Sequence, residues 1–320
     1  MRAVIAGVGG HLPSRIVTND ELSLTIDTSD AWIRERTGIG ERRLAGPGET
    51  CASMATEAAR RALENAGASP ADVDAVVLAT ATPDQAFPAT ALRVQAALGI
   101  ERGFGFDVSA ACSGFIYALS LVDSMIRTGQ VTGALVIGSE VYSRIMNWQD
   151  RGTCVLFGDG AGAVFLRAAK PGEEGRGVLS THLHADGRLG DLLYVDGAVG
   201  RPDRPGQLAM NGREIFRHAV AKLAAVVDEA LLANGLQHDD VDWLVPHQAN
   251  RRIIDAMGKK LGLSPDRVVV TVDRHANTSA ASIPLALAEA CGDGRIKPGE
   301  LVVLEALGGG MTWGSALVRM

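Results

Sequence analysis

The residue most able to carry out covalent chemistry is Cys112. The run FGFDVSAACSGFIYALSLV, residues 104–122, passes from a β-rich stretch through small residues into a long apolar stretch. Cys112 is therefore expected at a strand-to-helix turn, where free N–H groups and the helix dipole lower the pKa of a thiol. A lone cysteine is more often a small buried apolar residue, which is the interpretation for Cys51, Cys154 and Cys291. Cys112 is the candidate nucleophile.

A histidine and an asparagine occupy turns in the second half of the chain. The strand in DWLVPHQAN is expected to end at Pro246, which places His247 at the edge where open α/β sheets usually hold their sites. In VTVDRHANTSAASIP we expect a strand, a polar turn that contains Asn277, and a helix. An asparagine there can also be an ordinary helix cap. His275, close by, is interpreted as a structural or supporting residue.

A glycine run near the C-terminus is the fourth segment of interest. EALGGGMTWGSALV, residues 305–318, has three glycines between two expected strands. Such glycines permit close approach of the backbone to a ligand, and their N–H groups can stabilise an oxyanion, although a hairpin turn explains them equally well. The earlier GVGG at 7–10 lacks the GxGxxG pattern that opens a helix, so it is not interpreted as a dinucleotide site.

The elements that must position these residues occur twice. ALENAGASPADVDAVVL at 62–78 and ALLANGLQHDDVDWLV at 230–245 each predict a helix that ends at a glycine, then a loop and a strand. Weaker pairs, 128–140 with 294–306 and 96–100 with 259–263, keep the same order. The turn with Asn277 is then the counterpart of the turn with Cys112, so the two turns should face each other. At a constant offset of 168 the shared residues are Ala62/Ala230, Leu63/Leu231, Gly67/Gly235, Asp72/Asp240, Val73/Val241, Asp74/Asp242 and Val77/Val245.

The repeat predicts a duplicated α/β protein. A period of about 165 residues is too long for a solenoid, whose repeats span about 20–50 residues. Continuously apolar strands, at 75–80, 134–139 and 301–306, are typical of sheets covered on both faces. We expect alanine-rich helices at 51–66, 113–127, 217–233 and 281–291. The first half, 1–172, then carries the nucleophile, and the second, 173–320, carries the histidine, the asparagine and the glycine run.

Composition excludes several classes of protein. The net charge of −6 argues against a nucleic-acid binder, and no apolar run approaches the ~18 residues needed to cross a bilayer. The N-terminus predicts a strand and a turn, not a signal peptide. Four cysteines without a CxxC pair support neither a zinc site nor a disulfide framework, and favour a reduced, cytoplasmic location. No cysteine or acidic residue lies at ligand spacing from His182 and His184, so no metal is expected.

Taken together, the segments resemble β-ketoacyl-acyl-carrier-protein synthase III of the thiolase superfamily over the whole chain. SAACSGF, VPHQAN, HANTSAASIP and GGGMTWGSALV occur in the family's order, with DTSDAWIRERTGI at 27–39 and DRGTCVLFGDGAGA at 150–163. The resemblance implies a five-layered αβαβα fold, normally a homodimer, with a triad of Cys112, His247 and Asn277.

The resemblance also implies a reaction. Cys112 would attack the thioester of an acyl-CoA, while the N–H groups of Cys112 and Gly309 hold the oxyanion. Malonyl-acyl-carrier protein would then lose CO2, and His247 and Asn277 would donate hydrogen bonds to the resulting enolate. The enolate carbon would attack the Cys112 thioester. No metal or redox cofactor is implied.

The family likewise implies binding residues. Trp32 would stack on adenine, and arginines suit phosphate groups. The implied CoA-binding residues are Trp32, Arg36, Thr28 and Arg151 at the nucleotide and its phosphates, with Asn250 and Phe216 along the pantetheine arm. The acidic carrier protein would meet Arg251, Arg252, Lys259 and Lys260 of helix 250–261, with Arg217, although a solvated helix face explains these residues equally well. Phe87 matches a residue that enters the partner's acyl pocket and favours short primers.

Several other acyl-transfer enzymes compete with this interpretation. A thiolase needs a second cysteine near the glycine run, which GGGMTWG lacks, and elongating ketosynthases resemble a Cys-His-His arrangement, whereas Asn277 stands third here. A non-catalytic partner subunit would have lost the nucleophile or the histidine. The main alternative is a related acyltransferase of secondary metabolism with a different acceptor. The primer (acetyl, longer straight-chain or branched) is left open.

Overall fold

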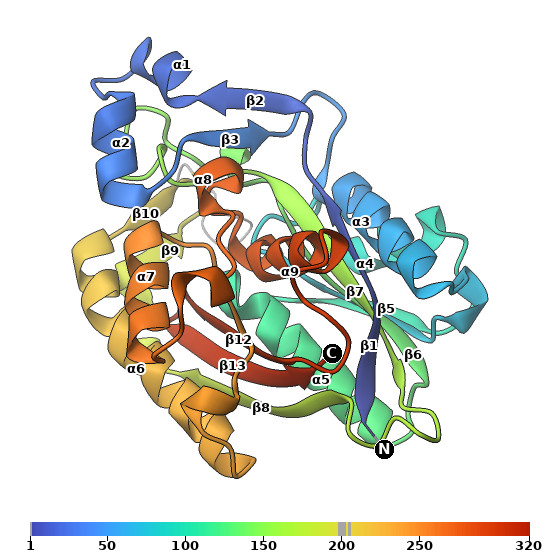
Figure 1. The fold of residues 1–320 in the computed structure, drawn as a ribbon. Coiled ribbons are helices and arrows are strands. Elements are labelled where there is room, and N and C mark those ends of the chain that lie inside the picture. The colour runs from blue at the N-terminus through green and yellow to red at the C-terminus, as the bar shows by residue number, and fades with distance from the viewer. Residues whose placement is uncertain (1, 198–202, 204–205) are drawn as a thin grey trace.

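Two mixed β-sheets form the framework of the protein in the computed structural model, which describes residues 2–197, 203 and 206–320 (Figure 1). Each sheet combines parallel and antiparallel neighbours. In order, the first sheet consists of β1 (Ala3–His11), β7 (Gly160–Ala168), β6 (Gly133–Glu140), β4 (Ala75–Ala79) and β5 (Phe104–Val108). The second consists of β11 (Trp243–Pro246), β12 (Leu301–Gly308), β13 (Thr312–Arg319) and β8 (Gly177–Ala185).

Helices make three further layers. Helices α3 (Cys51–Ala66) and α4 (Thr90–Ala97) pack on the first sheet, and α6 (Gly212–Ala233), with α7 (Arg251–Lys260) beside it, packs on the second. Between the sheets lie α5 (Gly114–Arg127) and α9 (Ser282–Gly292), which contact strands of both (Figure 1). This order of layers is the αβαβα architecture expected from the sequence.

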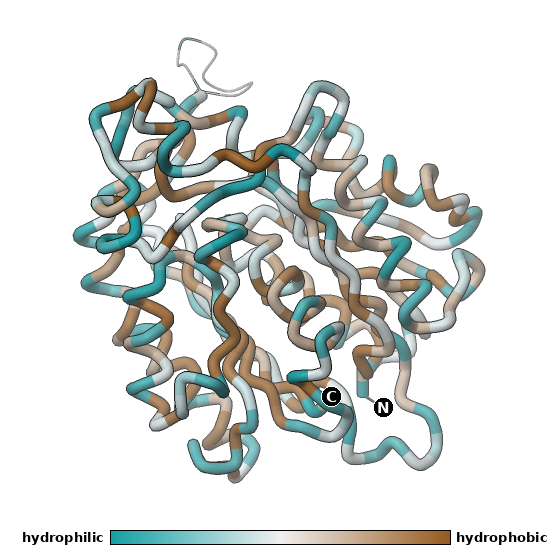
Figure 2. Tube along the Cα trace, turned by 45° about the horizontal axis from the view of Figure 1, so that its top comes forward, coloured by the Kyte–Doolittle hydropathy of each residue, from teal (hydrophilic) through white to brown (hydrophobic). Residues whose placement is uncertain are grey.

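The apolar residues of the sheets and central helices fill the core. Every residue of β4, β6 and β12 is buried, which fits their continuous apolar sequences. Figure 2 shows brown, hydrophobic stretches of chain running through the middle of the molecule. Small residues allow close packing on the first sheet. A Cβ added at Gly7 of β1 would lie 2.2 Å from the carbonyl oxygen of Ala62 in α3. The alanine-rich helix therefore rests directly on the strand.

The helix–loop–strand unit predicted from the repeat forms in both halves. Gly67 directly follows α3, and Gly235 follows α6 after Asn234, with φ of 62° and 66°. Asp72 and Asp240 then each accept, at 2.8 Å, the backbone N–H of the residue three positions earlier. The residues that recur in the sequence thus make the same contacts in each half.

One predicted strand does not form. The start of VTVDRHANTSAASIP was expected to be a strand, but this region has an isolated bridge at Val268 and then the one-turn helix α8 (Val272–His275). The buried Gln248 side chain accepts the backbone N–H groups of Thr271 and Val272 at 2.8 and 3.1 Å. Because a side chain supplies these hydrogen bonds, the segment turns instead of extending the sheet.

Shorter elements border the two sheets. The ribbon β2 (Arg15–Thr18) with β3 (Glu41–Leu44), and helices α1 (Asn19–Ser23) and α2 (Asp30–Thr37), form the blue corner of Figure 1. Buried Arg42 anchors this corner by donating to Asn19 Oδ1 at 2.8 Å and to Val155 O at 3.0 Å. A second ribbon pairs β9 (Leu193–Val195) with β10 (Leu208–Met210). Among the described residues, none of the helices combines the length and hydropathy that a membrane crossing requires.

Candidate active site

Cys112 lies in a strained turn between a strand and a central helix, as the sequence predicts. A 3-10 turn, Ala111–Ser113, connects β5 to α5. Ala111, directly before the cysteine, has a φ of 44°, a left-handed conformation that non-glycine residues rarely adopt. Such backbone strain concentrates at functional sites. Cys112 itself is 3% exposed.

The predicted lowering of the Cys112 pKa is wrong for this structure. Burial raises the pKa of the thiol to about 12, and the nearby Glu140 carboxylate acts in the same direction. Helix α5 begins only at Gly114, so the loss of solvation outweighs the favourable end of the helix. Cys112 is therefore a neutral thiol at rest, and it must lose a proton before it can attack.

His247 follows the last residue of β11 and is held as a neutral hydrogen-bond donor. Its Nδ1 lies 2.6 Å from Ser282 Oγ, which accepts the Gln248 backbone N–H at 3.3 Å. The Ser282 hydroxyl can donate to Nδ1 or accept from it, and when it donates, the imidazole proton lies on Nε2. Burial lowers the pKa of His247 to about 3, so the ring is uncharged at neutral pH.

Asn277 is also fixed as a donor. Its Oδ1 accepts the Ser279 backbone N–H at 2.8 Å, which leaves the amide N–H groups to donate. The Asn277 backbone pairs with the chain at Leu156 and Gly158, at 2.9 and 3.0 Å. Ala276 has φ 57° and ψ −162°, a conformation that favours glycine. Like Cys112, Asn277 thus sits after a strained alanine.

The glycine run lies against the nucleophile turn. A Cβ added at Gly308 would be 2.6 Å from the backbone nitrogen of Cys112, so only glycine permits this contact. Thr312 holds the two segments together: its Oγ1 lies 3.1 Å from Ala110 O and 3.0 Å from Gly309 O. Ser113 Oγ donates to the same Thr312 oxygen at 2.7 Å. Gly309 is thereby held one residue from the contact with Cys112.

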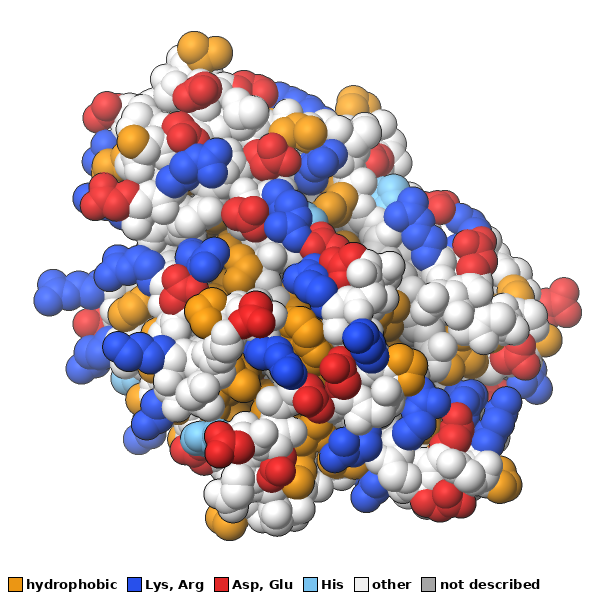
Figure 3. Space-filling view, in the orientation of Figure 1, with side chains coloured by type: hydrophobic (Ala, Val, Ile, Leu, Met, Phe, Trp, Pro, Cys, Tyr) orange, Lys and Arg blue, Asp and Glu red, His pale blue; other side chains and the backbone are white. Residues whose placement is uncertain are grey.

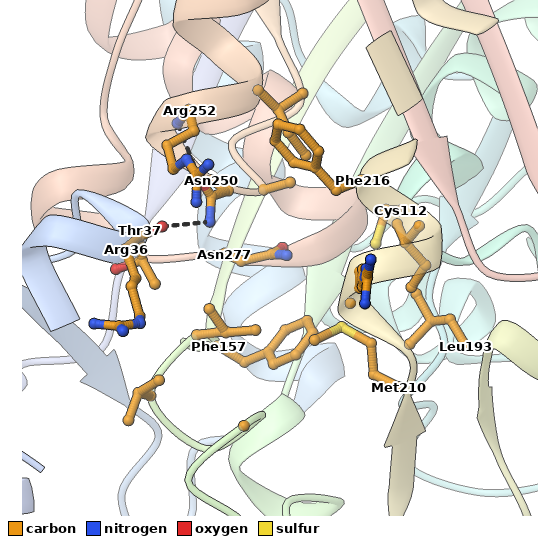
Figure 4. Close-up of a pocket in the computed structure, with 18 of the residues that line it drawn as sticks. Arg36, Thr37, Cys112, Phe157, Leu193, Met210, Phe216, Asn250, Arg252 and Asn277 are labelled. Atoms are coloured by element: carbon orange, nitrogen blue, oxygen red, sulfur yellow. Dashed lines mark hydrogen bonds between the residues drawn. The ribbon is translucent and has the colours of Figure 1, made fainter. Parts of the chain in front are cut away.

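A single cavity of about 500 Å³ is lined by Cys112, His247 and Asn277 together (Figure 4). Of the binding residues predicted from the sequence, Trp32, Arg36, Phe216 and Asn250 also line it. The apolar wall of the cavity was not predicted from the sequence, and it includes Leu156, Phe157, Leu193, Met210, Ile215 and Leu307. These residues come mainly from loops and the short β9–β10 ribbon, where no periodic pattern marks them.

Two arginines flank the indole at the mouth of the cavity. The guanidinium groups of Arg36 and Arg151 lie 4.5 and 5.0 Å from the centre of the Trp32 ring. Arg151 also donates to Asp27 O at 2.8 Å. This arrangement offers a flat ring for a base and positive charge for phosphates. Arg151 lies against the Trp32 ring but does not line the cavity, and Thr28 does not line it either.

Asn250 and Phe216 connect three helices around the mouth. Asn250 caps α7 by accepting the Arg252 N–H at 2.8 Å, and its amide donates to Arg36 O at 3.1 Å, the contact drawn in Figure 4. The Arg252 guanidinium lies 5.4 Å from the centre of the Phe216 ring. Arg252, predicted for the carrier patch, is therefore also part of the cavity wall.

The predicted basic patch lies on the surface near this mouth. Its residues are exposed on α6 and α7, where blue side chains gather in Figure 3, and they are Arg217, Arg251, Arg252, Lys259 and Lys260. Two of them pair with acids of their own helices. Arg217 contacts Glu214 and Arg251 contacts Asp255, each at 2.7 Å. Phe87 is 85% exposed and lies outside the cavity of its own chain.

The histidine pair has an acidic partner that sequence analysis did not find. Glu229 of α6 lies 3.1 Å from His182 Nδ1 and 2.6 Å from His184 Nε2. Even so, within the part of the chain that the structure describes, no three His, Cys, Asp or Glu side chains are arranged to hold a metal ion. His275 is buried with its Nε2 3.4 Å from Glu289. All four cysteines are free thiols.

Family models match both halves of the site. Residues 106–187 match the model described as 3-oxoacyl-[acyl-carrier-protein] synthase III, and residues 231–320 match the model of its C-terminal part. The β-ketoacyl-[acyl-carrier-protein] synthase III of Acidiphilium cryptum is 70% identical over 99% of each chain. That of Granulibacter bethesdensis is 65% identical over 100% of this chain and 99% of its own. The chain belongs to the β-ketoacyl-acyl-carrier-protein synthase III family.

Solved structures of this synthase family have the same fold. The Aquifex aeolicus synthase III is 46% identical with a TM-score of 0.94, covering 99% of this chain and 100% of that one. The Pseudomonas aeruginosa synthase III is 42% identical with a TM-score of 0.93, covering 100% and 98%. The priming β-ketosynthase of the R1128 polyketide pathway is 35% identical with a TM-score of 0.93, covering 99% and 96%. The predictions of family, thiolase-like fold and enzyme class are confirmed: the protein is an acyltransferase of fatty acid biosynthesis.

Proposed function

We propose that the protein condenses a short acyl-CoA, with acetyl-CoA as the first candidate, with malonyl-acyl-carrier protein and so initiates fatty acid synthesis. The observation that carries this proposal is the single cavity that joins Cys112, His247 and Asn277 to a mouth built around Trp32 and Arg36. Family membership supports the same reaction. The product is a β-ketoacyl-carrier protein, and no cofactor takes part.

In the first half-reaction, Cys112 Sγ forms a bond to the thioester carbon of the acyl-CoA. The carbonyl oxygen becomes an oxyanion, which the N–H groups of Cys112 and Gly309 stabilise. The contact of Gly308 with Cys112 and the Thr312 hydrogen bonds support this pairing of backbone donors. The bond to sulfur of CoA then breaks, and CoA departs through the mouth.

In the second half-reaction, the malonyl group loses CO2 and becomes an enolate. His247 Nε2–H and the Asn277 amide donate to the enolate oxygen, and the enolate carbon attacks the Cys112 thioester. A new carbon–carbon bond forms as the Cys112 thiolate leaves. The neutral imidazole and the fixed Asn277 amide support these roles, because both groups hold protons to donate.

Acyl-CoA enters between α2, α6 and α7 in this proposal. Adenine stacks near Trp32, and Arg36, Thr28 and Arg151 surround the nucleotide and phosphates. Asn250 and Phe216 border the pantetheine arm. The two guanidinium groups beside the Trp32 ring support the nucleotide end, and the lining by Asn250 and Phe216 supports the arm.

The acidic carrier protein docks on the basic residues of α6 and α7, from which its arm enters the same mouth. The patch consists of Arg217, Arg251, Arg252, Lys259 and Lys260, whose exposure supports the proposal. The active form is a homodimer in which Phe87 enters the partner's acyl pocket, as the large exposure of its ring suggests. Four free thiols fit a cytoplasmic location. The division into halves at 172/173 falls between β7 and β8.

Intact mass spectrometry tests the proposed reaction. Purified protein is incubated with acetyl-CoA, and malonyl-acyl-carrier protein is then added. We expect an acetyl group on Cys112, absent from Cys112→Ala, that passes to the carrier as acetoacetyl. Acylation without condensation would overturn the proposed acceptor and favour another one, as in secondary metabolism. No acylation by any short acyl-CoA would overturn the reaction itself.

A further inference from the structure

A tyrosine from the first half of the chain lies behind the wall of the cavity. Tyr142, two residues after the end of β6, is 4% exposed and belongs to an apolar cluster with Met146, Phe157 and Leu208. Its ring stacks on the Phe157 ring, with the ring centres 4.8 Å apart and the planes 19° from parallel. Phe157 lines the cavity, whereas Tyr142 does not. Any effect of Tyr142 on the site must therefore pass through the residues that it contacts.

The hydroxyl of Tyr142 reaches the segment that carries Asn277. Ser279 Oγ donates to the Tyr142 hydroxyl oxygen at 3.1 Å, and both residues are buried. The backbone N–H of the same Ser279 donates to Asn277 Oδ1 at 2.8 Å. Ser279 therefore joins the tyrosine, which it contacts through its side chain, to the amide of Asn277, which it contacts through its backbone.

Ser279 needs a contact of this kind because its backbone is strained. Its φ of 51° lies in the left-handed region, which non-glycine residues seldom adopt. Such a conformation persists only where the surrounding structure holds it. The direction of the Ser279 N–H depends on this conformation, so a contact that holds Ser279 also holds the hydrogen bond to Asn277 Oδ1. That bond leaves the NH2 group of Asn277 to donate.

The ring of Tyr142 supports Asn277 by a second route. Phe157, on which the ring stacks, forms a parallel bridge with Asn277, and both residues line the cavity in Figure 4. In that bridge the Asn277 N–H donates to Leu156 O at 2.9 Å, and the Gly158 N–H donates to Asn277 O at 3.0 Å. Tyr142 thus holds, through its hydroxyl and its ring, neighbours of both the side chain and the backbone of Asn277.

We propose that Tyr142 is a positioning residue for condensation, which holds the Asn277 amide where it donates to the enolate. Its hydroxyl acts through Ser279 and its ring acts through Phe157. This inference rests on the proposed function, because it gives Tyr142 a task in the second half-reaction. The first half-reaction does not use the Asn277 amide, so acylation of Cys112 should not depend on the Tyr142 hydroxyl.

The effect of the hydroxyl should be on geometry and not on proton transfer. Burial raises the pKa of Tyr142 well above its usual value of 10, so the hydroxyl keeps its proton at the pH values of an assay. Positions in an active site matter on a fine scale, since a misplacement of about 1 Å can slow a reaction by about 100-fold. Loss of the hydroxyl should therefore lower the rate of condensation equally at every pH.

Tyr142→Phe, which removes the hydroxyl and keeps the ring, tests the proposal. Acylation by acetyl-CoA is followed by intact mass, malonyl-acyl-carrier protein is then added, and the β-ketoacyl product is measured over time. We expect acylation within about 2-fold of the wild-type rate and condensation slower by about 10-fold. The kcat of condensation should fall while the KM for malonyl-acyl-carrier protein stays the same, because the bond to the enolate forms only as CO2 leaves.

Ser279→Ala removes the same hydrogen bond from its other side. It should also slow condensation. Because the Tyr142 hydroxyl acts through Ser279, adding Tyr142→Phe to Ser279→Ala should cost nothing further, so the double variant should condense as fast as Ser279→Ala alone. Losses that multiply in the double variant would show that the two hydroxyls act independently, which would overturn the proposal.

Tyr117→Phe is the matched control. Tyr117, on α5, donates its hydroxyl to His184 O at 2.8 Å, so the variant removes a tyrosine hydrogen bond outside the Asn277 segment and should keep both rates. Wild-type condensation in Tyr142→Phe, or equal losses in acylation and condensation, would overturn the positioning role. If Tyr142→Phe does not fold, wild-type condensation in Ser279→Ala overturns it equally. An acylated wild type that fails to condense would instead contradict the proposed function.

Discussion

The Cys112 turn and the Asn277 turn hold equivalent places in the two halves and contact each other. Each leads into a helix of the central layer, α5 in the first half and α9 in the second. Each also has an alanine at positive φ just before the functional residue, 44° at Ala111 and 57° at Ala276. One turn presents a thiol and the other an amide donor. The two strained turns thus lie against each other, which fits the divided tasks proposed for their residues.

The approach to the two turns differs more than the turns themselves. In the first half, β5 pairs with β4 and runs into the Cys112 turn. In the second half the equivalent strand is missing, and the Gln248 side chain binds the backbone in its place. Gln248 directly follows His247, so the same residue fixes both the histidine and the Asn277 segment. In the second half, hydrogen bonds of the Gln248 side chain thus take the place of strand pairing and link the segments that carry His247 and Asn277.

The proposed division of tasks predicts that substitutions in the two turns impair different steps of the reaction. Cys112→Ala removes the nucleophile and should lower acetyl transfer by about 10⁴-fold or more. Asn277→Ala removes one donor to the enolate, so condensation should fall by about 10²–10³-fold while acylation continues. Intact mass measures acylation, and release of the β-ketoacyl product measures condensation. If Asn277→Ala stopped acylation as completely as Cys112→Ala, the two turns would not have separate tasks.

A second contrast concerns two buried carboxyl groups, one on a strand of each large sheet. Glu140 on β6 is surrounded by donors, whereas Oε2 of Glu305 on β12 has no hydrogen-bond partner among the described residues. Burial raises the pKa of Glu305 to about 8 from an ordinary value of 4.5. A raised pKa favours the protonated folded state. The stability it contributes is complete below pH 4.5 and is lost as pH rises to 8.

Glu305→Gln should therefore gain stability over the wild type as pH rises. The amide stays neutral, so the difference in free energy of unfolding should grow by about 4 kcal/mol between pH 5 and pH 8.5. Urea unfolding at several pH values measures this difference. Glu35→Gln, an exposed counterpart, should show no such trend. A difference that stays constant with pH would mean that Glu305 is not protonated in the folded protein.

The sequence located the candidate nucleophile and histidine because each follows an element with a readable pattern, and the asparagine because the repeat makes its turn the counterpart of the Cys112 turn. Cys112 comes between an apolar strand and an apolar helix, and His247 follows a proline that ends a strand. The structure places all three in one cavity, while their roles remain predictions. The apolar wall from Leu193 and Met210 was not predictable, because short ribbons carry no periodicity.

The two errors at the site share a cause in tertiary contacts. The thiol pKa was expected to be low from its local helix, but Gly308 and its neighbours cover Cys112 and remove solvent. A strand was expected before Asn277, but the Gln248 side chain accepts the backbone N–H groups of Thr271 and Val272 there. In both cases a residue distant in sequence outweighed a local preference. Contacts of this kind become visible only when the chain is folded.

The smallest expected effect compares one of the two strained alanines with an ordinary one. Ala276→Gly should raise the free energy of unfolding by about 1 kcal/mol, because relief of strain at φ 57° and ψ −162° exceeds the added chain entropy. Ala288→Gly, within α9, should lower it by about 1 kcal/mol. Urea unfolding measures both. A loss of stability in Ala276→Gly as large as in Ala288→Gly would show that the turn stores no strain, and that its likeness to the Cys112 turn is one of shape alone.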